Sequence, residues 1–95
     1  MYNIYVTFEC IPGKRAEFVE LVAKEGILDA IRAEDGNHRY EYFYSADDET
    51  KLLLIEAWET KAHQQVHMTQ PHMAKLKALK EGRITNTVIG EFAFV

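Results

Sequence analysis

The chain has 95 residues, of which 47% are hydrophobic and 27% charged, and its 15 acidic and 11 basic side chains give a net charge of −4. These values predict one globular domain over residues 1–95, and they exclude a disordered chain and a membrane-spanning one. Lys and Arg do not cluster among aromatic residues, so nucleic acid is not an expected partner, and the start of the chain lacks a signal-peptide pattern, so we expect a cytoplasmic protein.

Residues 2–11 alternate between apolar and more polar side chains, which is the period of a strand, and Pro12-Gly13 then predicts a turn. Cys10 lies on the apolar side of this strand. A single cysteine forms no internal disulfide and no cysteine-based zinc site, so we expect Cys10 to be a small buried hydrophobe.

From Lys14 to Ile31 the apolar residues recur every three or four positions, which predicts an amphipathic helix. Gly26 falls inside this pattern and predicts a kink or break there. Gly36 then suits the end of the helical region, because glycine is common just after a helix.

Two apolar runs around a polar turn predict a β-hairpin in the middle of the chain. The first strand, residues 38–46, carries Tyr40, Tyr42 and Tyr44 on one face, and residues 51–58 form the second. Thr60 can cap the next helix, Pro71 suits the first turn of a further one, and residues 84–95 alternate as a last strand.

The resulting order, β-α-β-β-α-β, is typical of an α+β, ferredoxin-like fold with a four-stranded antiparallel sheet and helices on one face. Both faces of the predicted strands carry bulky groups, for example Tyr5 beside Ile4 and Leu53 beside Leu54. A second copy of the chain could cover the free face, so we expect a homodimer with a shared interior. A misjudged strand register is the alternative explanation of the crowding.

Three of the four histidines, His63, His67 and His72, fall within ten residues. A neutral imidazole can accept or donate a proton near pH 7, so His67 and His72 are candidate catalytic residues, whereas we expect an exposed His63 that caps or packs. A metal site is the alternative, but Glu56 and Glu59 are the only carboxylates near in sequence, and we predict no metal.

Trp58 and the tyrosines could be core residues or pocket walls. The sequence shows no Ser-His-Asp pattern, phosphate-binding glycine loop or dinucleotide fingerprint, so we predict no flavin, nicotinamide or nucleotide cofactor.

Residues 54–63 (LIEAWETKAH) and 67–73 (HMTQPHM) together resemble the antibiotic biosynthesis monooxygenase (ABM) family, and especially its bacterial quinol monooxygenases. Pro12-Gly13-Lys14, residues 34–37 (EDGN) and Tyr40 support the resemblance. It implies a dimeric α/β barrel that oxygenates a quinol-like or other small aromatic substrate with dioxygen and without any cofactor. It also implies that His67 and His72 transfer protons, with Trp58, Tyr40, Tyr42 and Asn37 as substrate-binding candidates.

Departures from the family pattern keep alternatives open. Leu54 replaces an asparagine of the aromatic-polyketide oxygenases, and Val6, His67 and Lys77 replace the Asn, Trp and His of the haem-degrading branch. The 67–72 motif also resembles isomerases of the phosphorylated autoinducer-2 signal, for which Arg39 and Arg83 could bind the phosphate. A non-catalytic dimer that binds a small ligand is the third possibility.

Overall fold

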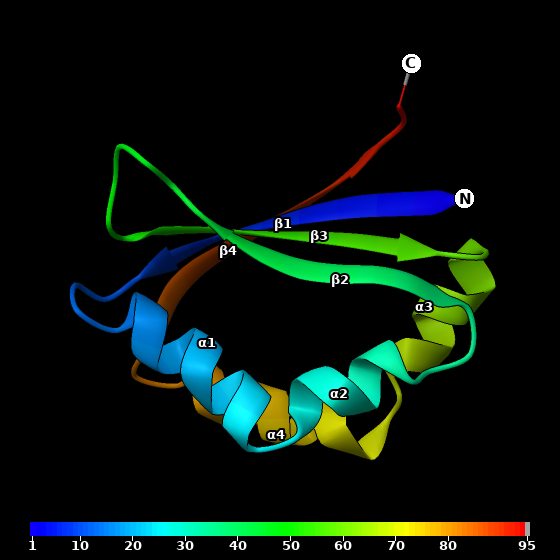
Figure 1. Cartoon of the computed structure of the whole chain (residues 1–95), viewed down its shortest axis with the longest axis horizontal. Coiled ribbons are helices and arrows are strands. Elements are labelled where there is room, and N and C mark those ends of the chain that lie inside the picture. The colour runs from blue at the N-terminus through cyan, green and yellow to red at the C-terminus, as the bar shows by residue number, and fades with distance from the viewer. Residues whose placement is uncertain (95) are drawn as a thin grey trace.

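A computed structural model of the chain describes residues 1–94. Along them run β1 (Tyr2–Cys10), α1 (Arg15–Lys24), α2 (Ile27–Arg32), β2 (Asn37–Tyr44), β3 (Lys51–Trp58), α3 (Lys61–His67), α4 (Pro71–Lys80) and β4 (Ile84–Phe92). The strands form one antiparallel sheet in the order β2-β3-β1-β4, and the helices lie on one side of it (Figure 1). The predicted ferredoxin-like α+β fold is confirmed. The first predicted helix is divided into α1 and α2, and the two helices predicted after Thr60 and at Pro71 are α3 and α4.

The break between α1 and α2 lies at Gly26, as predicted. Its φ of +76° belongs to the left-handed region, which glycine enters without the steric cost of a Cβ, and the helical hydrogen bonds are interrupted there. The break between α3 and α4 precedes Pro71, whose ring fixes φ and whose nitrogen donates no hydrogen bond. Each pair of short helices therefore bends along the sheet (Figure 1).

The helix-covered face of the sheet holds the core. Ile4, Val6 and Phe8 of β1 lie opposite Glu56, Leu54 and Leu52 of β3, and all six are buried. Their partners from the helices are also almost fully buried: Phe18, Val22, Ile27, Ile31 and Leu76. The alternation read from the sequence therefore identified the buried side of β1, including Cys10, which is 2% exposed.

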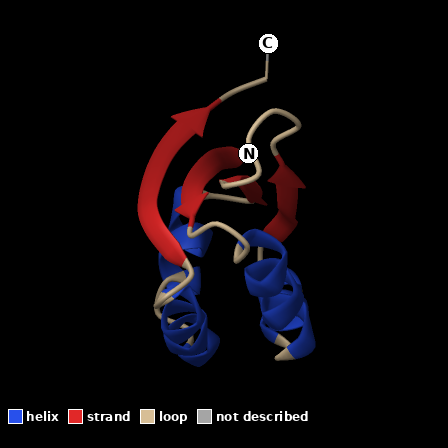
Figure 2. Cartoon of the chain, turned by 90° about the vertical axis from the view of Figure 1, so that its left-hand side faces the viewer, coloured by secondary structure: helices blue, strands red, loops and turns tan. Residues whose placement is uncertain are grey.

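The opposite face of the sheet is apolar as well. Tyr5 pairs with Ile55, and Leu53 pairs with both Thr7 and Phe43, so these side chains share one face. Within residues 1–94 no helix covers this face (Figure 2). This register rules out the alternative that misjudged pairing caused the apparent crowding. Strands β2 and β4 are the two edges of the sheet, so one chain alone does not close a barrel.

A separate finding concerns membranes: none of the helices within residues 1–94 has the length and apolar character needed to cross one.

Candidate functional site

Helices α3 and α4 bring His67 and His72 together. Thr60 begins α3, and its side-chain oxygen accepts the backbone N–H of His63 at 3.3 Å. His67 is the last residue of α3 and is only 1% exposed, whereas His72, in the first turn of α4, is partly exposed. The tight turn between the two helices thus places a buried imidazole beside a more accessible one.

Glu34, in the loop between α2 and β2, joins the two histidines. Its Oε2 lies 2.8 Å from Nδ1 of His67 and 2.8 Å from Nε2 of His72. A carboxylate only accepts hydrogen bonds, so each imidazole donates an N–H to this oxygen. Sequence reasoning missed Glu34, which lies 33 residues before His67 in a predicted loop.

Glu56 of β3 lies on the other side of His67. Its Oε1 accepts the indole N–H of Trp58 at 3.0 Å and lies 3.9 Å from Nε2 of His67. Burial raises the pKa of the Glu56 carboxyl to about 7, although the Trp58 hydrogen bond opposes the change. Burial also lowers the pKa of His67, against the effect of Glu34. Glu56 can therefore hold or release a proton near neutral pH, next to an imidazole that is neutral there.

Aromatic rings enclose His67. The Trp58 ring lies 4.6 Å from the His67 ring, and the Tyr40 ring lies 6.0 Å from it. Tyr42 packs edge-on against Tyr40 at 5.9 Å, and burial raises the pKa of both phenols. The structure therefore gathers four predicted site residues, His67, Trp58, Tyr40 and Tyr42, in one buried cluster.

Asn37, the remaining predicted substrate-binding residue, lies beside this cluster at a β-bulge. It pairs with Trp58 along the sheet, but its side-chain amide donates to the backbone oxygen of Arg39 at 3.2 Å. Among residues 1–94 no hydrogen bond links its side chain to Glu34, His67 or Glu56.

The two arginines considered for a phosphate are both paired with carboxylates. Arg39 donates to Glu41 at 3.0 Å, and Arg83 donates to Glu17 at 2.9 Å. Neither arginine lines a pocket described below.

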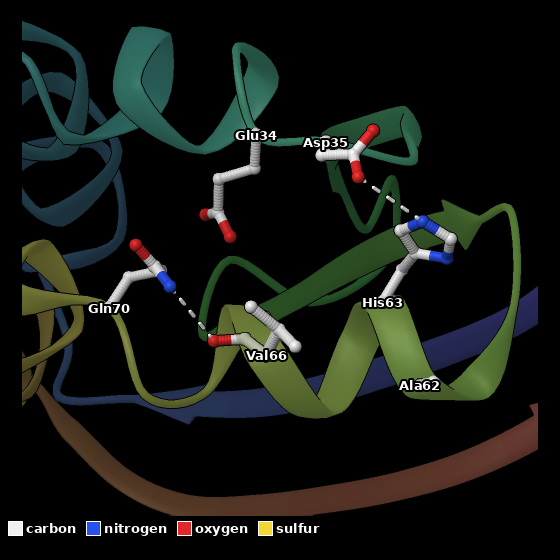
Figure 3. Close-up of a pocket in the computed structure, with 6 residues that line it drawn as sticks. All are labelled: Glu34, Asp35, Ala62, His63, Val66 and Gln70. Atoms are coloured by element: carbon white, nitrogen blue, oxygen red, sulfur yellow. Dashed lines mark hydrogen bonds and ion pairs between the residues drawn. The ribbon is translucent and has the colours of Figure 1, made fainter.

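A first pocket, here called the outer pocket, has a volume of about 380 Å³ and lies between the α2–β2 loop and α3 (Figure 3). Its lining residues are Glu34, Asp35, Ala62, His63, Val66 and Gln70. The carboxyl group of Glu34 therefore meets this pocket on one side and the two histidines on the other.

A second pocket, here called the α4 pocket, has a volume of about 520 Å³. Its lining residues belong to the α3–α4 turn and α4: Met68, Thr69, Gln70, Pro71, Met73, Ala74, Leu76, Lys77 and Lys80. Lys80 connects this pocket with the sheet, because its ammonium lies 5.1 Å from the centre of the Phe8 ring. Burial lowers the pKa of Lys80, and the negative charge of Glu56 counteracts that effect.

His63 differs from its predicted exposure. Its Nδ1 lies 2.7 Å from the Thr60 hydroxyl, its Nε2 lies 3.4 Å from Asp35, and its side chain is 29% exposed. Its ring also packs against Gly36, at a place that a Cβ on that residue would occupy. His63 thus packs and lines the outer pocket.

A metal ion is chemically compatible with part of this site. Donor atoms of Glu34, His67 and His72 all lie within 4.8 Å of one another, and such a set suits Zn²⁺. Ligands around a tetrahedral zinc lie roughly 3.3 Å apart, whereas Glu34 lies at hydrogen-bond distance from both rings. We therefore describe the three residues as a hydrogen-bonded set. The carboxylate that meets the histidines is Glu34, while Glu59 instead pairs with His38.

The model of the family described as "Antibiotic biosynthesis monooxygenase" matches residues 1–79. A Bacillus subtilis (strain 168) protein named "Putative monooxygenase YcnE" is 31% identical over 61 residues, which make up 64% of this chain and 62% of that relative's length. The match therefore spans less than two thirds of the relative.

Solved structures share the fold across nearly the whole chain. A "Putative antibiotic biosynthesis monooxygenase" from Nitrosomonas europaea has a TM-score of 0.85 at 23% identity, covering 100% of this chain and 99% of that one. SnoaB from Streptomyces nogalater, described as a cofactor-independent oxygenase, has a TM-score of 0.80 at 16% identity, covering 98% and 91%. These likenesses establish the fold, and the family match covers most of the chain. The chain therefore belongs to the antibiotic biosynthesis monooxygenase family.

Proposed function

We propose that this protein is a cofactor-independent monooxygenase that oxidises a quinol or another small phenol with dioxygen in a pocket of a homodimer. The observation that carries the proposal is the set of Glu34, His67 and His72, joined by hydrogen bonds of 2.8 Å, with the buried carboxyl of Glu56 3.9 Å from His67. Met68, the residue after His67, lines the α4 pocket. Proton-accepting groups next to an apolar cavity are what such a reaction requires of a protein. The description of SnoaB as a cofactor-independent oxygenase supports the reaction class.

The chemistry needs no electron source other than the substrate. Loss of a proton makes a hydroquinone electron-rich enough to pass one electron to dioxygen, and the two radicals then combine at a ring carbon. The resulting hydroperoxide loses water, so hydroquinone and O₂ give a hydroxyquinone and H₂O. One oxygen atom enters the ring, the other leaves as water, and the substrate supplies all four electrons. The protein has to provide a base and a pocket that excludes water.

The α4 pocket suits a phenolate better than the outer pocket does. Met68, Met73 and Leu76 give it an apolar wall, and the Lys80 ammonium can stabilise a negative oxygen. Glu34 and Asp35 line the outer pocket, and their negative charges would repel an anion.

In this proposal His67 and His72 handle the proton, and Trp58, Tyr40 and Tyr42 form the aromatic wall behind it. The packing of those rings around His67 supports the assignment. Asn37 stays a predicted substrate contact, at the strand end next to Trp58.

The homodimer is part of the proposal because the second face of the sheet is apolar. Its larger side chains are Tyr5, Phe43, Leu53, Ile55, Val88 and Phe92. Val88 is 51% exposed at the edge strand β4. We expect Val88→Asp to shift the protein from dimer to monomer in sedimentation experiments, with Thr87→Asp, on the other face of β4, as the matched control. A wild-type monomer at micromolar concentration would contradict the dimer.

The activity test is oxygen consumption by EDTA-treated protein with a panel of hydroquinones, after subtraction of autoxidation. We expect uptake that falls about 100-fold or more in His67→Ala and His72→Ala. The matched control is His38→Ala, because His38 pairs with Glu59 outside the site. No uptake by a folded wild-type protein would contradict the proposal for these compounds. Turnover of a phosphorylated sugar would then favour an isomerase, and tight binding without turnover would favour a binding protein.

A further inference from the structure

We propose that Glu34, His67 and His72 form a binding site for one divalent metal ion of the zinc type, which would replace the two hydrogen bonds that join them. The site stands apart from the proposed function, and only its effect on the reaction, given last, rests on that function. The sequence predicts no metal, because Glu56 and Glu59 are the only carboxylates near the histidines along the chain. Glu34, 33 residues before His67, supplies a carboxylate in space.

The three side chains present a suitable set of ligand atoms. Two imidazole nitrogens and one carboxylate oxygen suit borderline divalent ions such as Zn²⁺, with water as a further ligand. Nδ1 of His67 and Nε2 of His72 both lie 2.8 Å from the same atom, Oε2 of Glu34. A ring nitrogen that loses its proton has a lone pair in the direction of the former N–H, so both lone pairs would point at one place.

The donor atoms have to move little to hold an ion. All three lie within 4.8 Å of one another, whereas ligands of a tetrahedral zinc lie roughly 3.3 Å apart. Glu34 therefore has to withdraw from each nitrogen by about 0.5 Å. Glu34 belongs to a loop and His72 to the first turn of α4, and both are partly exposed. These two side chains can adjust around His67, which is buried.

The surroundings of His67 supply the outer contact that metal-bound histidines have in proteins. A metal-bound imidazole carries its proton on the other nitrogen, which usually donates to a carboxylate or a carbonyl. Nε2 of His67 lies 3.9 Å from Oε1 of Glu56, which is held by a hydrogen bond of 3.0 Å from Trp58. An approach of about 1 Å or one bridging water completes the contact. Glu56 can therefore orient His67 toward an ion.

The outer pocket gives an ion a route to the site. Glu34 and Asp35 line this pocket, and Figure 3 shows the Glu34 carboxyl directed from the α2–β2 loop toward α3. The Asp35 side chain is 98% exposed. Two carboxylates at a pocket attract cations and raise their local concentration. Water in this pocket can supply the remaining ligand.

Zinc titration of EDTA-treated and desalted protein tests the site without any substrate. By calorimetry we expect one Zn²⁺ per chain with a Kd of about 1 μM or tighter. Glu34→Gln and His72→Ala, which change partly exposed residues, should each weaken binding about 100-fold or more. His38→Ala is the matched control, because His38 pairs with Glu59 outside the set. A wild-type Kd weaker than about 100 μM, or unchanged binding in Glu34→Gln, would overturn the site.

Nitrogen-15 NMR of histidine-labelled protein identifies the ligand atoms. We expect Zn²⁺ to shift Nδ1 of His67 and Nε2 of His72, while His67 keeps its proton on Nε2. The signals of His38 and His63 should stay where they are. A response confined to His63 would assign the ion to the pair of His63 and Asp35, whose side chains lie 3.4 Å apart, and would overturn the site.

Glu56→Gln tests the contact behind His67. The variant keeps an acceptor oxygen but removes the negative charge, so we expect zinc binding to weaken about 10-fold. Glu81→Gln, at the exposed end of α4, is the matched control. Equal affinities in the two variants would overturn the part of Glu56, while the titration of Glu34→Gln decides on the site itself.

The effect on the reaction, which rests on the proposed function, is inhibition. With an ion on Nδ1 of His67 and Nε2 of His72, the protons occupy the other ring nitrogens, and neither imidazole can accept a proton. With an active hydroquinone, stoichiometric Zn²⁺ should lower oxygen uptake about 100-fold, and EDTA should restore it. Full turnover with Zn²⁺ bound would overturn the inhibition. No uptake by the metal-free wild type would instead contradict the proposed function and leave the titration to decide on the site.

Discussion

The two ends of the helix-covered face are built differently. At one end, Phe8 and Leu52 of the sheet pack with Phe18 of α1, and the rings of Phe8 and Phe18 lie 6.1 Å apart. At the other end, the buried groups include Glu56 and His67 beside Trp58. The first end, here called the apolar end, buries mainly apolar side chains, whereas the second, here called the ionisable end, also buries a carboxyl group and an imidazole.

This difference separates stability from chemistry within one layer. Burying hydrocarbon stabilises the fold, while burying a carboxyl group and an imidazole costs free energy that hydrogen bonds only partly offset. A protein of this size has a modest core, so we expect the apolar end to compensate for the ionisable end.

Removal of a ring from the apolar end should have the largest effect. Phe18 is fully buried, and Phe18→Ala leaves a cavity, so we expect a loss of about 3–5 kcal/mol in the free energy of unfolding. Urea denaturation measures it, with Glu20→Ala on the exposed side of the same helix as the control. A loss below about 1 kcal/mol would show that the apolar end does not carry the stability.

Glu56 should make stability depend on pH. Its pKa is about 7 in the fold and 4.5 ordinarily, so the folded state holds its proton more tightly, and the stabilisation present below pH 4.5 is lost as the pH rises through 7. At about 1.4 kcal/mol per tenfold change in proton affinity, the loss is about 3 kcal/mol.

The difference in unfolding free energy between wild type and Glu56→Gln isolates this contribution, measured by denaturation from pH 4.5 to 8. His67, whose pKa is lowered, gives an opposite slope below pH 6.5 in both proteins, so it largely cancels in the difference. Parallel curves for the two proteins would mean that Glu56 is not perturbed by the fold.

Trp58→Phe should raise the pKa of Glu56 further. The substitution keeps most of the ring but removes the indole N–H that stabilises the carboxylate at 3.0 Å. A hydrogen bond to a charged group contributes about 1.5–3 kcal/mol, so we expect the NMR midpoint of Glu56 to rise by about one pH unit or more. Tyr40→Phe, which also alters an aromatic neighbour of His67 without removing that hydrogen bond, serves as the comparison. An equal shift in both variants would assign the effect to packing.

The smallest effect should follow from Thr60→Ala. This change removes the side-chain cap of α3, the helix that ends at His67, and should cost about 1 kcal/mol. Thr60→Ser keeps the hydroxyl and should retain most of the stability in the same thermal unfolding experiment. If both variants lose the same amount, the cap is not the cause.

The sequence predicted the structure correctly where a local hydrophobic period or a local helix break determines it. Alternation placed Ile4, Val6 and Phe8 on the buried face, and Gly26 marked the division of the first helical region. The proximity of His67 and His72 was also expected, because the two residues are close along the chain.

The candidate site was only partly predictable. Glu34 lies in a loop, where no period reveals which way a side chain points, and its partners are 33 and 38 residues away. Glu56 occupies an apolar position of a strand, which was visible, but the perturbation of its pKa depends on Lys80, Trp58 and Glu34 from three separate parts of the chain. His63 was expected to be exposed, but its ring packs against Gly36. Glycine has no side chain, so the sequence pattern gave no sign of this contact.

The pairing of β1 with β4 has a consequence for how the molecule forms. Asn3 lies opposite Phe92 and Val6 opposite Ile89, so one edge of β1 pairs with a strand that follows every other helix and strand of residues 1–94. The β2–β3 hairpin and the contacts among Glu34, Glu56, His67 and His72 lie earlier in the chain. Closing so long a loop costs entropy and slows folding. On a ribosome, the ionisable end can therefore assemble while one edge of β1 still lacks its neighbour, and that edge is what a chaperone would need to shield.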